Sequence, residues 1–278
     1  MKSPLIWGVN ARPTVWLRWV LLALPFVLLI AVYLYASDVR LTDNPADKLL
    51  PSFSQMADAV QEMAFTEDKR TGSYLLWSDT YASLKRILLG TLLAALVGLW
   101  LGLNNGLFPG MDATGNPFIT FISMIPPLAI LPILFISFGV DELAKVMLIF
   151  LGVFPLISRD IRLAVKQIPH EQITKAATLG ISQLQLVYRI ILPQIMPRLI
   201  ETVRLSLGSA WLFLIAAEAI AADQGLGYRI FLVRRYLAMD IILPYVLWIT
   251  FIGFMMDWLL RWALAYFYPW YTKKASSN

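Results

Sequence analysis

Long apolar runs, separated by shorter polar segments, make up most of this chain. A helix needs about 20 successive apolar residues to cross a hydrocarbon layer roughly 30 Å thick, because each residue advances it by about 1.5 Å. The pattern therefore predicts an all-α integral membrane protein, with a single transmembrane domain over residues 1–278. On this criterion we expect about six transmembrane helices: Trp16–Tyr35, Leu84–Leu103, Pro117–Phe138, Ala144–Ser158, Ile200–Ala222 and Ile242–Tyr266.

Two of these spans have open alternatives. A few residues around Gly139 are all that divides the third predicted span from the fourth, and we expect a tight turn there. The first run has a secretory signal peptide as its alternative. That run is long, however, and no small-residue cleavage site follows it cleanly, so we predict a helix.

The polar segment 37–82, which follows the first predicted span, contains a helical repeat. Its apolar residues recur at helical spacing: Phe53, Met56, Ala57, Val60 and Met63. We expect a short amphipathic helix that lies along the outer membrane surface.

The second long polar segment, 159–198, has the signals of two short helices joined at a glycine. Pro169 precedes the first helix, and Glu171 is well placed near its positive N-terminal end. Gly180 supplies the stop at the end of that helix. Ser182 and Gln185 have the spacing of a capping box, which predicts that a second helix starts directly afterwards.

This second helix is expected to run to the vicinity of Pro193, and the chain to rejoin the membrane near Pro197. Ala176 and Ala177 carry small side chains, which let another protein pack closely. The alternative is a merely solvated loop. Because helix caps and small residues coincide here, we favour a docking element.

Small residues follow one face of the second predicted span at intervals of four: Gly90, Ala94, Gly98, Gly102 and Gly106. This spacing places them on one stripe, where the backbone of another helix can approach closely. The alternative is that glycine is simply common in membrane helices. We predict a packing face.

The third predicted span is rich in proline. Pro126, Pro127 and Pro132 each remove a helical hydrogen bond, and the freed carbonyl groups must be satisfied by protein or by water in a cavity. Broken helices often line substrate paths, whereas proline kinks are also common in ordinary bundles. Both readings stay open, with these prolines as pathway candidates.

Charged residues within the predicted spans are few, and each costs at least ~2.5 kcal/mol at the bilayer centre. Asp257 with Arg261, and Glu201 with Arg204, are spaced to pair on one helical face. Glu218 has no such partner nearby in the sequence. It is a candidate gate or cavity residue, or else a glutamate that reaches the outer interface.

Composition supports the membrane assignment, with 59% hydrophobic residues, 15% charged residues and a mean hydropathy of +0.67. The absence of cysteine excludes disulfides and thiolate catalysis. The single histidine, His170, is expected to be a solvated residue at a helix start and makes no histidine metal cluster. No GxxxxGK[ST] loop and no Ser, His and acid triad occur, so we predict no enzyme activity.

A slight excess of Lys and Arg in the loops on one side of the membrane indicates that both termini are cytoplasmic.

Several motifs together resemble one family. KAATLG followed by IILPQIMP is similar to the EAA loop of permease subunits of ATP-binding-cassette importers. SLKRILLG, IPPLAILPILFISFG and AWLFLIAAEAIAADQGLGY resemble the nitrate, sulfonate, taurine and bicarbonate branch of that family. The resemblance extends over most of the chain.

The resemblance implies a type I, MetI-like permease with six helices and a cytoplasmic coupling loop, in the bacterial inner membrane. It implies a second permease copy, most simply as a homodimer, and an extracytoplasmic substrate-binding protein. A cytoplasmic ATPase dimer would bind ATP and Mg, and this chain no cofactor. The resemblance assigns the coupling to Lys175, Ala176, Ala177, Gly180, Leu192 and Pro193. Lys175 stands where the family has glutamate.

The branch transports small polar solutes, and the chain's C-terminal part also resembles members linked to small nitrogen compounds such as guanidinium or urea. Three arginines at the rim would suit an anion or the acidic surface of a binding protein, and we expect the latter: Arg229, Arg234 and Arg235. Two other functions stay open. One is an ATP-independent secondary transporter that uses Glu218 for proton coupling, and the other is a membrane scaffold that transports nothing.

Overall fold

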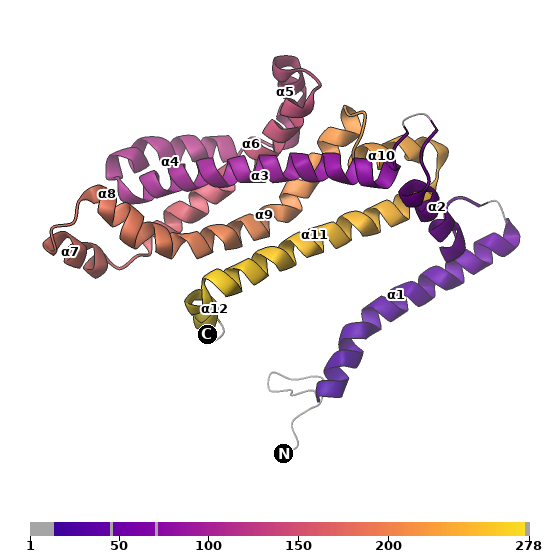
Figure 1. Cartoon of the computed structure of the whole chain (residues 1–278), viewed down its shortest axis with the longest axis horizontal. Coiled ribbons are helices and arrows are strands. Elements are labelled where there is room, and N and C mark those ends of the chain that lie inside the picture. Colours follow the sequence, from indigo (N-terminus) through magenta and orange to yellow (C-terminus); the bar gives the residue numbers. More distant parts are fainter. Residues whose placement is uncertain (1–13, 45–46, 70–71, 276–278) are drawn as a thin grey trace. The chain divides into compact units, whose positions relative to one another are not determined.

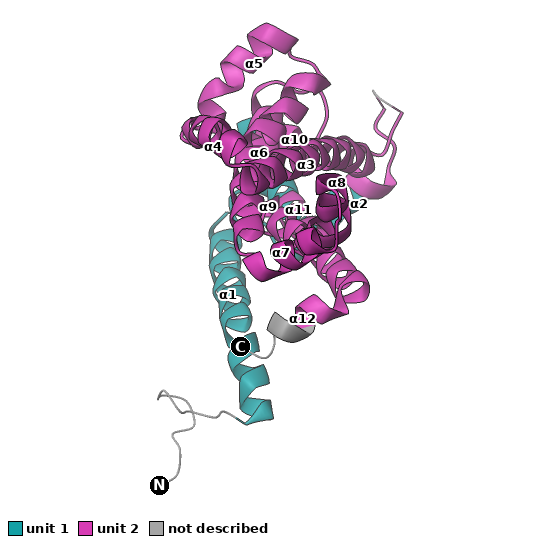
Figure 2. Ribbon diagram, turned by 90° about the vertical axis from the view of Figure 1, so that its left-hand side faces the viewer, with its two compact units in different colours: residues 1–62, 233–244 teal, residues 63–232, 245–278 magenta. Residues whose placement is uncertain are grey.

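The computed structural model describes residues 14–44, 47–69 and 72–275, which are almost entirely helical (Figure 1). They form two compact units, residues 1–62 with 233–244 and residues 63–232 with 245–278 (Figure 2). The longer elements are α1 (Val15–Asp43), α2 (Phe53–Phe65), α3 (Leu75–Leu107), α4 (Pro109–Ser123), α6 (Glu142–Lys166), α9 (Leu192–Ile220) and α11 (Met239–Phe267). The shorter ones are η1 (Pro127–Ile130), α5 (Leu131–Phe138), α7 (His170–Thr178), α8 (Gln183–Leu186), η2 (Val187–Ile191), α10 (Leu226–Val233), η3 (Arg234–Tyr236) and α12 (Pro269–Ala275).

The first unit contains α1 and most of α2. Nearly all of the apolar side chains of α1 are exposed, as expected of a helix that is surrounded by lipid. Two hydroxyl groups of α1 tie it to the chain before α2: Tyr33 donates to the Pro51 carbonyl at 2.6 Å, and Ser37 to the Leu50 carbonyl at 2.9 Å. The helix predicted after Pro51 is confirmed as α2.

In the loop that follows α1, Asp47 is held by two donors. Its carboxylate accepts the Leu49 N–H at 2.9 Å and the Arg40 Nε–H at 2.5 Å. These hydrogen bonds, that of Leu49 first, lower the pKa of Asp47 below its usual value.

The core of the second unit is the packing of α3 against α6. The predicted small-residue stripe of α3 forms this contact, and a Cβ added at its glycines would lie within 3 Å of α6 side chains. Successive glycines oppose successive turns of α6: Gly90 faces Ile149, Gly98 faces Ile157, Gly102 faces Ile161 and Gly106 faces Val165. The packing face is therefore confirmed, with β-branched side chains filling the space that the glycines leave.

The third predicted span is not a straight helix. α4 and the η1–α5 segment meet at a bend of 83° around Pro126. Three prolines within seven residues remove the N–H groups that a continuous helix needs, so the chain turns instead.

Among the described residues, four helices are long and apolar enough to cross a membrane, and five if the bent pair counts as one span. The six predicted spans are not all confirmed. The missing one falls in α6, where Lys145 and Arg159 lie near the two ends of the apolar stretch and shorten its uncharged part.

One of the two predicted ion pairs is confirmed, since Arg261 contacts Asp257 within α11. The other is wrong. Arg204 contacts Asp257 instead, with 3.1 Å between Nε and Oδ1, while Glu201 accepts a hydrogen bond from Tyr271 at 2.6 Å. Arg204 thus pairs with a carboxylate of α11, whereas Glu201 pairs with Arg198, three residues before it, with 3.5 Å between Nη1 and Oε2.

Candidate functional site

The polar segment between α6 and α9 folds as two short helices around a glycine elbow. α7 begins at His170, whose side chain is exposed as predicted. Gly180 has a φ of +75°, in the left-handed region that suits glycine after a helix end. The capping box is confirmed: Gln185 N–H donates to Ser182 Oγ at 3.3 Å, and Ser182 N–H donates to Gln185 Oε1 at 3.1 Å.

The second short helix does not end near Pro193, contrary to the prediction. α8 continues through a π-helical turn, η2, into α9, and Leu192 N–H donates to the Val187 carbonyl five residues earlier. A proline clashes with the carbonyl four residues before it in an ordinary helix. The wider turn ahead of Pro193 relieves this clash, and the helix therefore continues into α9.

The elbow presents apolar side chains on an otherwise polar segment. Leu179 is 82% exposed, Leu184 69% and Tyr188 65%. Ala177 and Lys175 are exposed as well, whereas Ala176 is buried. Of the other predicted coupling residues, Gly180 and Pro193 are exposed and Leu192 is half-buried. The elbow therefore exposes three large apolar side chains within ten residues of each other.

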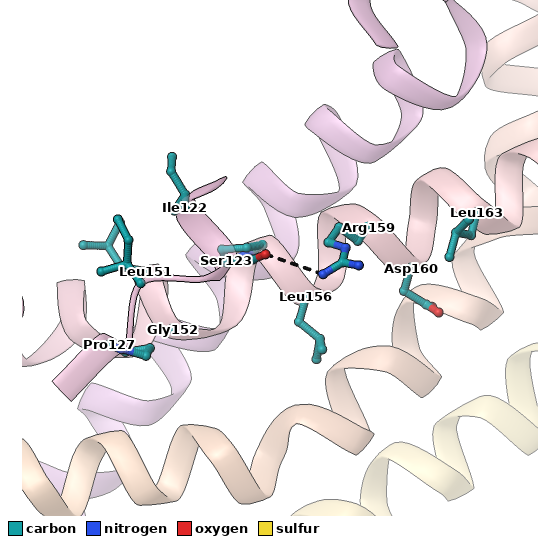
Figure 3. Close-up of a pocket in the computed structure, with 11 residues that line it drawn as sticks. Ile122, Ser123, Pro127, Leu151, Gly152, Leu156, Arg159, Asp160 and Leu163 are labelled. Atoms are coloured by element: carbon teal, nitrogen blue, oxygen red, sulfur yellow. Dashed lines mark hydrogen bonds between the residues drawn. The ribbon is translucent and has the colours of Figure 1, made fainter. Parts of the chain in front are cut away.

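A pocket of about 420 Å³ lies beside the bend between α4 and η1, against one face of α6, and we call it the α4–α6 pocket (Figure 3). Of the three candidate prolines, Pro127 lines it and the other two do not. Its lining is mainly apolar: Ile122, Ser123, Ile125, Pro127, Leu151, Gly152, Pro155, Leu156, Arg159, Asp160 and Leu163. Sequence reasoning placed prolines here but missed the polar groups, which come from α4 and α6.

Charged side chains at the C-terminal end of α6 are bound to neighbouring helices. Asp160 accepts two hydrogen bonds from Arg198, at 2.6 and 2.7 Å, and one from Thr202 at 2.5 Å. Arg162 binds Asp112 of α4 in the same bidentate way, at 2.5 and 3.1 Å. These pairs tie α6 to α9 and to α4.

Arg159 differs from these neighbours. Within the described part of the chain it has no carboxylate partner, and its Nη1 donates a hydrogen bond to Ser123 Oγ at 3.5 Å (Figure 3). The Arg159 side chain is exposed at the pocket. A guanidinium group has five N–H donors, so most of its capacity remains available to a ligand.

Glu218 lies at the other end of the bundle and does not line the α4–α6 pocket. It is fully buried, so it does not reach the outer interface. Its carboxylate accepts hydrogen bonds from Arg86 at 2.7 Å, from Ser83 at 2.8 Å and from the Gly227 N–H at 2.8 Å. The partner that was missing from its own helix is thus supplied by α3.

The same buried cluster also holds Arg229, against the expectation that it faces a binding protein. Arg229 Nε donates to Asp79 at 2.8 Å, and Asp79 is fully buried. Arg234 and Arg235 are exposed. Asp79 and Arg86 have no nearby signal in the sequence, because each finds its partner more than 50 residues away along the chain.

Residues 83–272 match a family described as binding-protein-dependent transport system inner membrane component. The chain is 35% identical over 196 residues to the taurine transport system permease protein TauC of Escherichia coli (strain K12), covering 70% of this chain and 71% of that protein. It is 32% identical over 197 residues to the bicarbonate transport system permease protein CmpB of Synechococcus elongatus, covering 68% of this chain and 70% of that protein. A solved structure of the inward-facing MetNI methionine ABC transporter has a similar fold, with a TM-score of 0.61 and 17% identity over 72% of this chain and 99% of that chain.

Proposed function

This chain belongs to the family of binding-protein-dependent transport system inner membrane components, and from this premise we propose how it is powered and what it carries. It is the permease subunit of an ABC importer, a multi-pass inner membrane protein and not an enzyme. The resemblance seen in the sequence is thereby confirmed, as is the helical type I permease fold. A partner ATPase and a substrate-binding protein belong to such a system.

We propose that the elbow from His170 to Pro193 is the coupling element that docks on the ATPase, which binds ATP and Mg. The exposed apolar side chains Leu179, Leu184 and Tyr188 are the observation that carries this proposal. Ala176 is buried, so its side chain is not available for a contact with the ATPase. The direct contacts with the ATPase then fall to Ala177 and Lys175.

In this mechanism, closure of two ATPase subunits moves two such elbows together, and the helical bundles rock between outward-open and inward-open states. We propose a homodimer of this chain, because one copy supplies one elbow. The elbow and both termini lie in the cytoplasm, and lipid covers the apolar surface of α1.

The transported solute is small and polar, in the class of taurine, bicarbonate, nitrate or sulfonates, with guanidinium and urea as the other candidates.

Copurification of the ATPase with variants of the elbow tests the coupling. Ala177→Trp places an indole in the docking surface, so we expect loss of the copurified ATPase and of ATP-driven uptake, with normal membrane insertion. Lys175→Glu reverses the charge at the same surface and is expected to act in the same direction. Ala31→Trp, at an exposed position of α1, is the matched control and should retain both. Unchanged uptake with Ala177→Trp contradicts the assignment.

A further inference from the structure

The α4–α6 pocket has a positive charge that is not neutralised within it. Its two charged lining residues are Asp160 and Arg159. Both oxygens of the Asp160 carboxylate accept hydrogen bonds from Arg198, which neutralises that group. Arg159, by contrast, has one long hydrogen bond to a neutral hydroxyl. The net charge that the pocket offers to a ligand is therefore that of Arg159.

The pocket is also built at a break in the backbone. Ser123 ends α4, and Pro127 begins η1 after the bend, so two sides of the helix break contribute to the lining. Interrupted backbone at membrane depth occurs where it is buried in protein or lines a water-filled cavity. Arg159 lies beside this break without a carboxylate partner among the described residues, so most of its N–H donors are available to a polar ligand.

We propose that the α4–α6 pocket binds the oxyanion group of the transported solute, with Arg159 as the cationic ligand and Ser123 as a hydroxyl donor. This assignment rests on the proposed transport function. The planar guanidinium fork matches two oxygens of a carboxylate, carbonate or sulfonate. A volume of about 420 Å³ accommodates a small organic anion, and the apolar wall suits a short hydrocarbon chain.

The charge of Arg159 discriminates between the candidate solutes. A guanidinium ion repels the arginine, and urea gains nothing from its charge. Taurine, bicarbonate and nitrate each present oxygen atoms with negative charge. The pocket thus selects the anionic members of the candidate list.

A lipid headgroup phosphate has the same oxyanion chemistry as these solutes, so the experiment must separate the two sources. The chain contains no cysteine, which makes single-cysteine labelling clean. Leu156 lines the pocket three residues before Arg159 and is half exposed, so Leu156→Cys places a thiol beside the proposed site. The full chain is assembled with its ATPase in phosphatidylcholine nanodiscs and treated with two methanethiosulfonates, one with a sulfonate and one with a trimethylammonium group.

We expect the sulfonate reagent to react faster than the ammonium reagent with the thiol of the Leu156→Cys variant. Adding Arg159→Gln should slow the sulfonate reagent about fivefold, the effect of one nearby charge in a watery site. Arg159→Lys should keep most of the preference, because the charge remains. The matched control is Leu184→Cys in the elbow, where Arg159→Gln should leave the ratio of the two rates unchanged.

Two further measurements identify the ligand and separate the test of the anion site from the test of the coupling. Excess taurine should protect the thiol of the Leu156→Cys variant from the reagent, and guanidinium chloride should not. Protection by phosphatidylglycerol in the nanodisc without protection by taurine or bicarbonate assigns the pocket to lipid and overturns the proposal. Equal rates for both reagents, with or without Arg159, also overturn it. The coupling is tested separately by Ala177→Trp in the same complexes: unchanged ATP-driven uptake there counts against the elbow assignment and not against the anion site.

Discussion

Two arginines of the second unit, Arg86 and Arg159, have opposite surroundings. Arg86 is almost fully buried and donates to Glu142 at 2.5 Å, to Glu218 at 2.7 Å and to the Gln224 carbonyl at 2.8 Å. Arg159 is exposed at a pocket and donates to Ser123 at 3.5 Å. One guanidinium group is saturated by the protein itself, and the other is left available.

This difference separates a structural role from a binding role. The donors of Arg86 hold the turn between α9 and α10 against α3, where Gly225 approaches so closely that an added Cβ would lie 2.6 Å from the Glu218 carboxylate. Arg159 does not hold two helices together in this way, since its hydrogen bond to Ser123 is long. Of these two arginines, the one without a carboxylate partner is the candidate for a ligand site. Glu218, which accepts hydrogen bonds from Arg86, Ser83 and Gly227, fails the same criterion.

The largest expected effect comes from breaking the saturated cluster. Arg86→Met leaves Glu218 buried without its cation, which should destabilise the fold by about 3–5 kcal/mol. The measurement is thermal unfolding in lipid nanodiscs, followed by tryptophan fluorescence. Arg86→Met combined with Glu218→Leu should recover part of this loss, because no lone buried charge remains. A single variant as stable as the parent would contradict the structural role of Arg86.

Local signals allowed prediction of the elbow from the sequence, whereas the charged clusters needed the fold. Ser182, Gln185 and Gly180 act on backbone groups close to them in the chain, so their spacing alone predicts the cap and the turn. The glycine stripe of α3 was also readable, because helical periodicity places it on one face.

Partners on different helices cannot be predicted from local sequence spacing. Asp79 and Arg229 are 150 positions apart, and Arg204 prefers Asp257 to the neighbouring Glu201. The α4–α6 pocket needs both a bend of 83° and the face of α6 that meets it. Proline spacing predicted a break there, but not its angle or the arginine that it exposes.

An intermediate effect is expected for Tyr271→Phe in α12. This hydroxyl donates to the Glu201 carboxylate at 2.6 Å in a half-buried site. Its removal should cost about 1.5–3 kcal/mol, the net contribution of a hydrogen bond to a charged group. Unfolding of the Tyr271→Phe variant is compared with that of the parent under the same conditions, with Tyr188→Phe at the exposed elbow as the control.

The same pair predicts a pH dependence. Burial, together with the hydrogen bond to Glu201, raises the pKa of Tyr271 above 10.0. The unfolded chain then loses the tyrosine proton before the folded one does, so the contribution is complete below pH 10 and is lost as the pH rises through the folded pKa. The stability difference between parent and Tyr271→Phe should shrink above that pH. A difference that grows instead would contradict the hydrogen bond.

The smallest effect on stability is expected for Arg159→Gln. This variant also tests directly whether Arg159, unlike Arg86, has no structural role. The side chain is exposed and forms one long hydrogen bond, so its replacement should change the free energy of unfolding by less than about 0.5 kcal/mol. Arg162→Gln, three residues on, removes the bidentate partner of Asp112 and should cost more, in the same assay. Uptake of taurine or bicarbonate should respond in the opposite order, with Arg159→Gln the more damaging change. If Arg159→Gln unfolds the chain as readily as Arg162→Gln does, the arginine is part of the scaffold and its charge is not available to a ligand at the pocket.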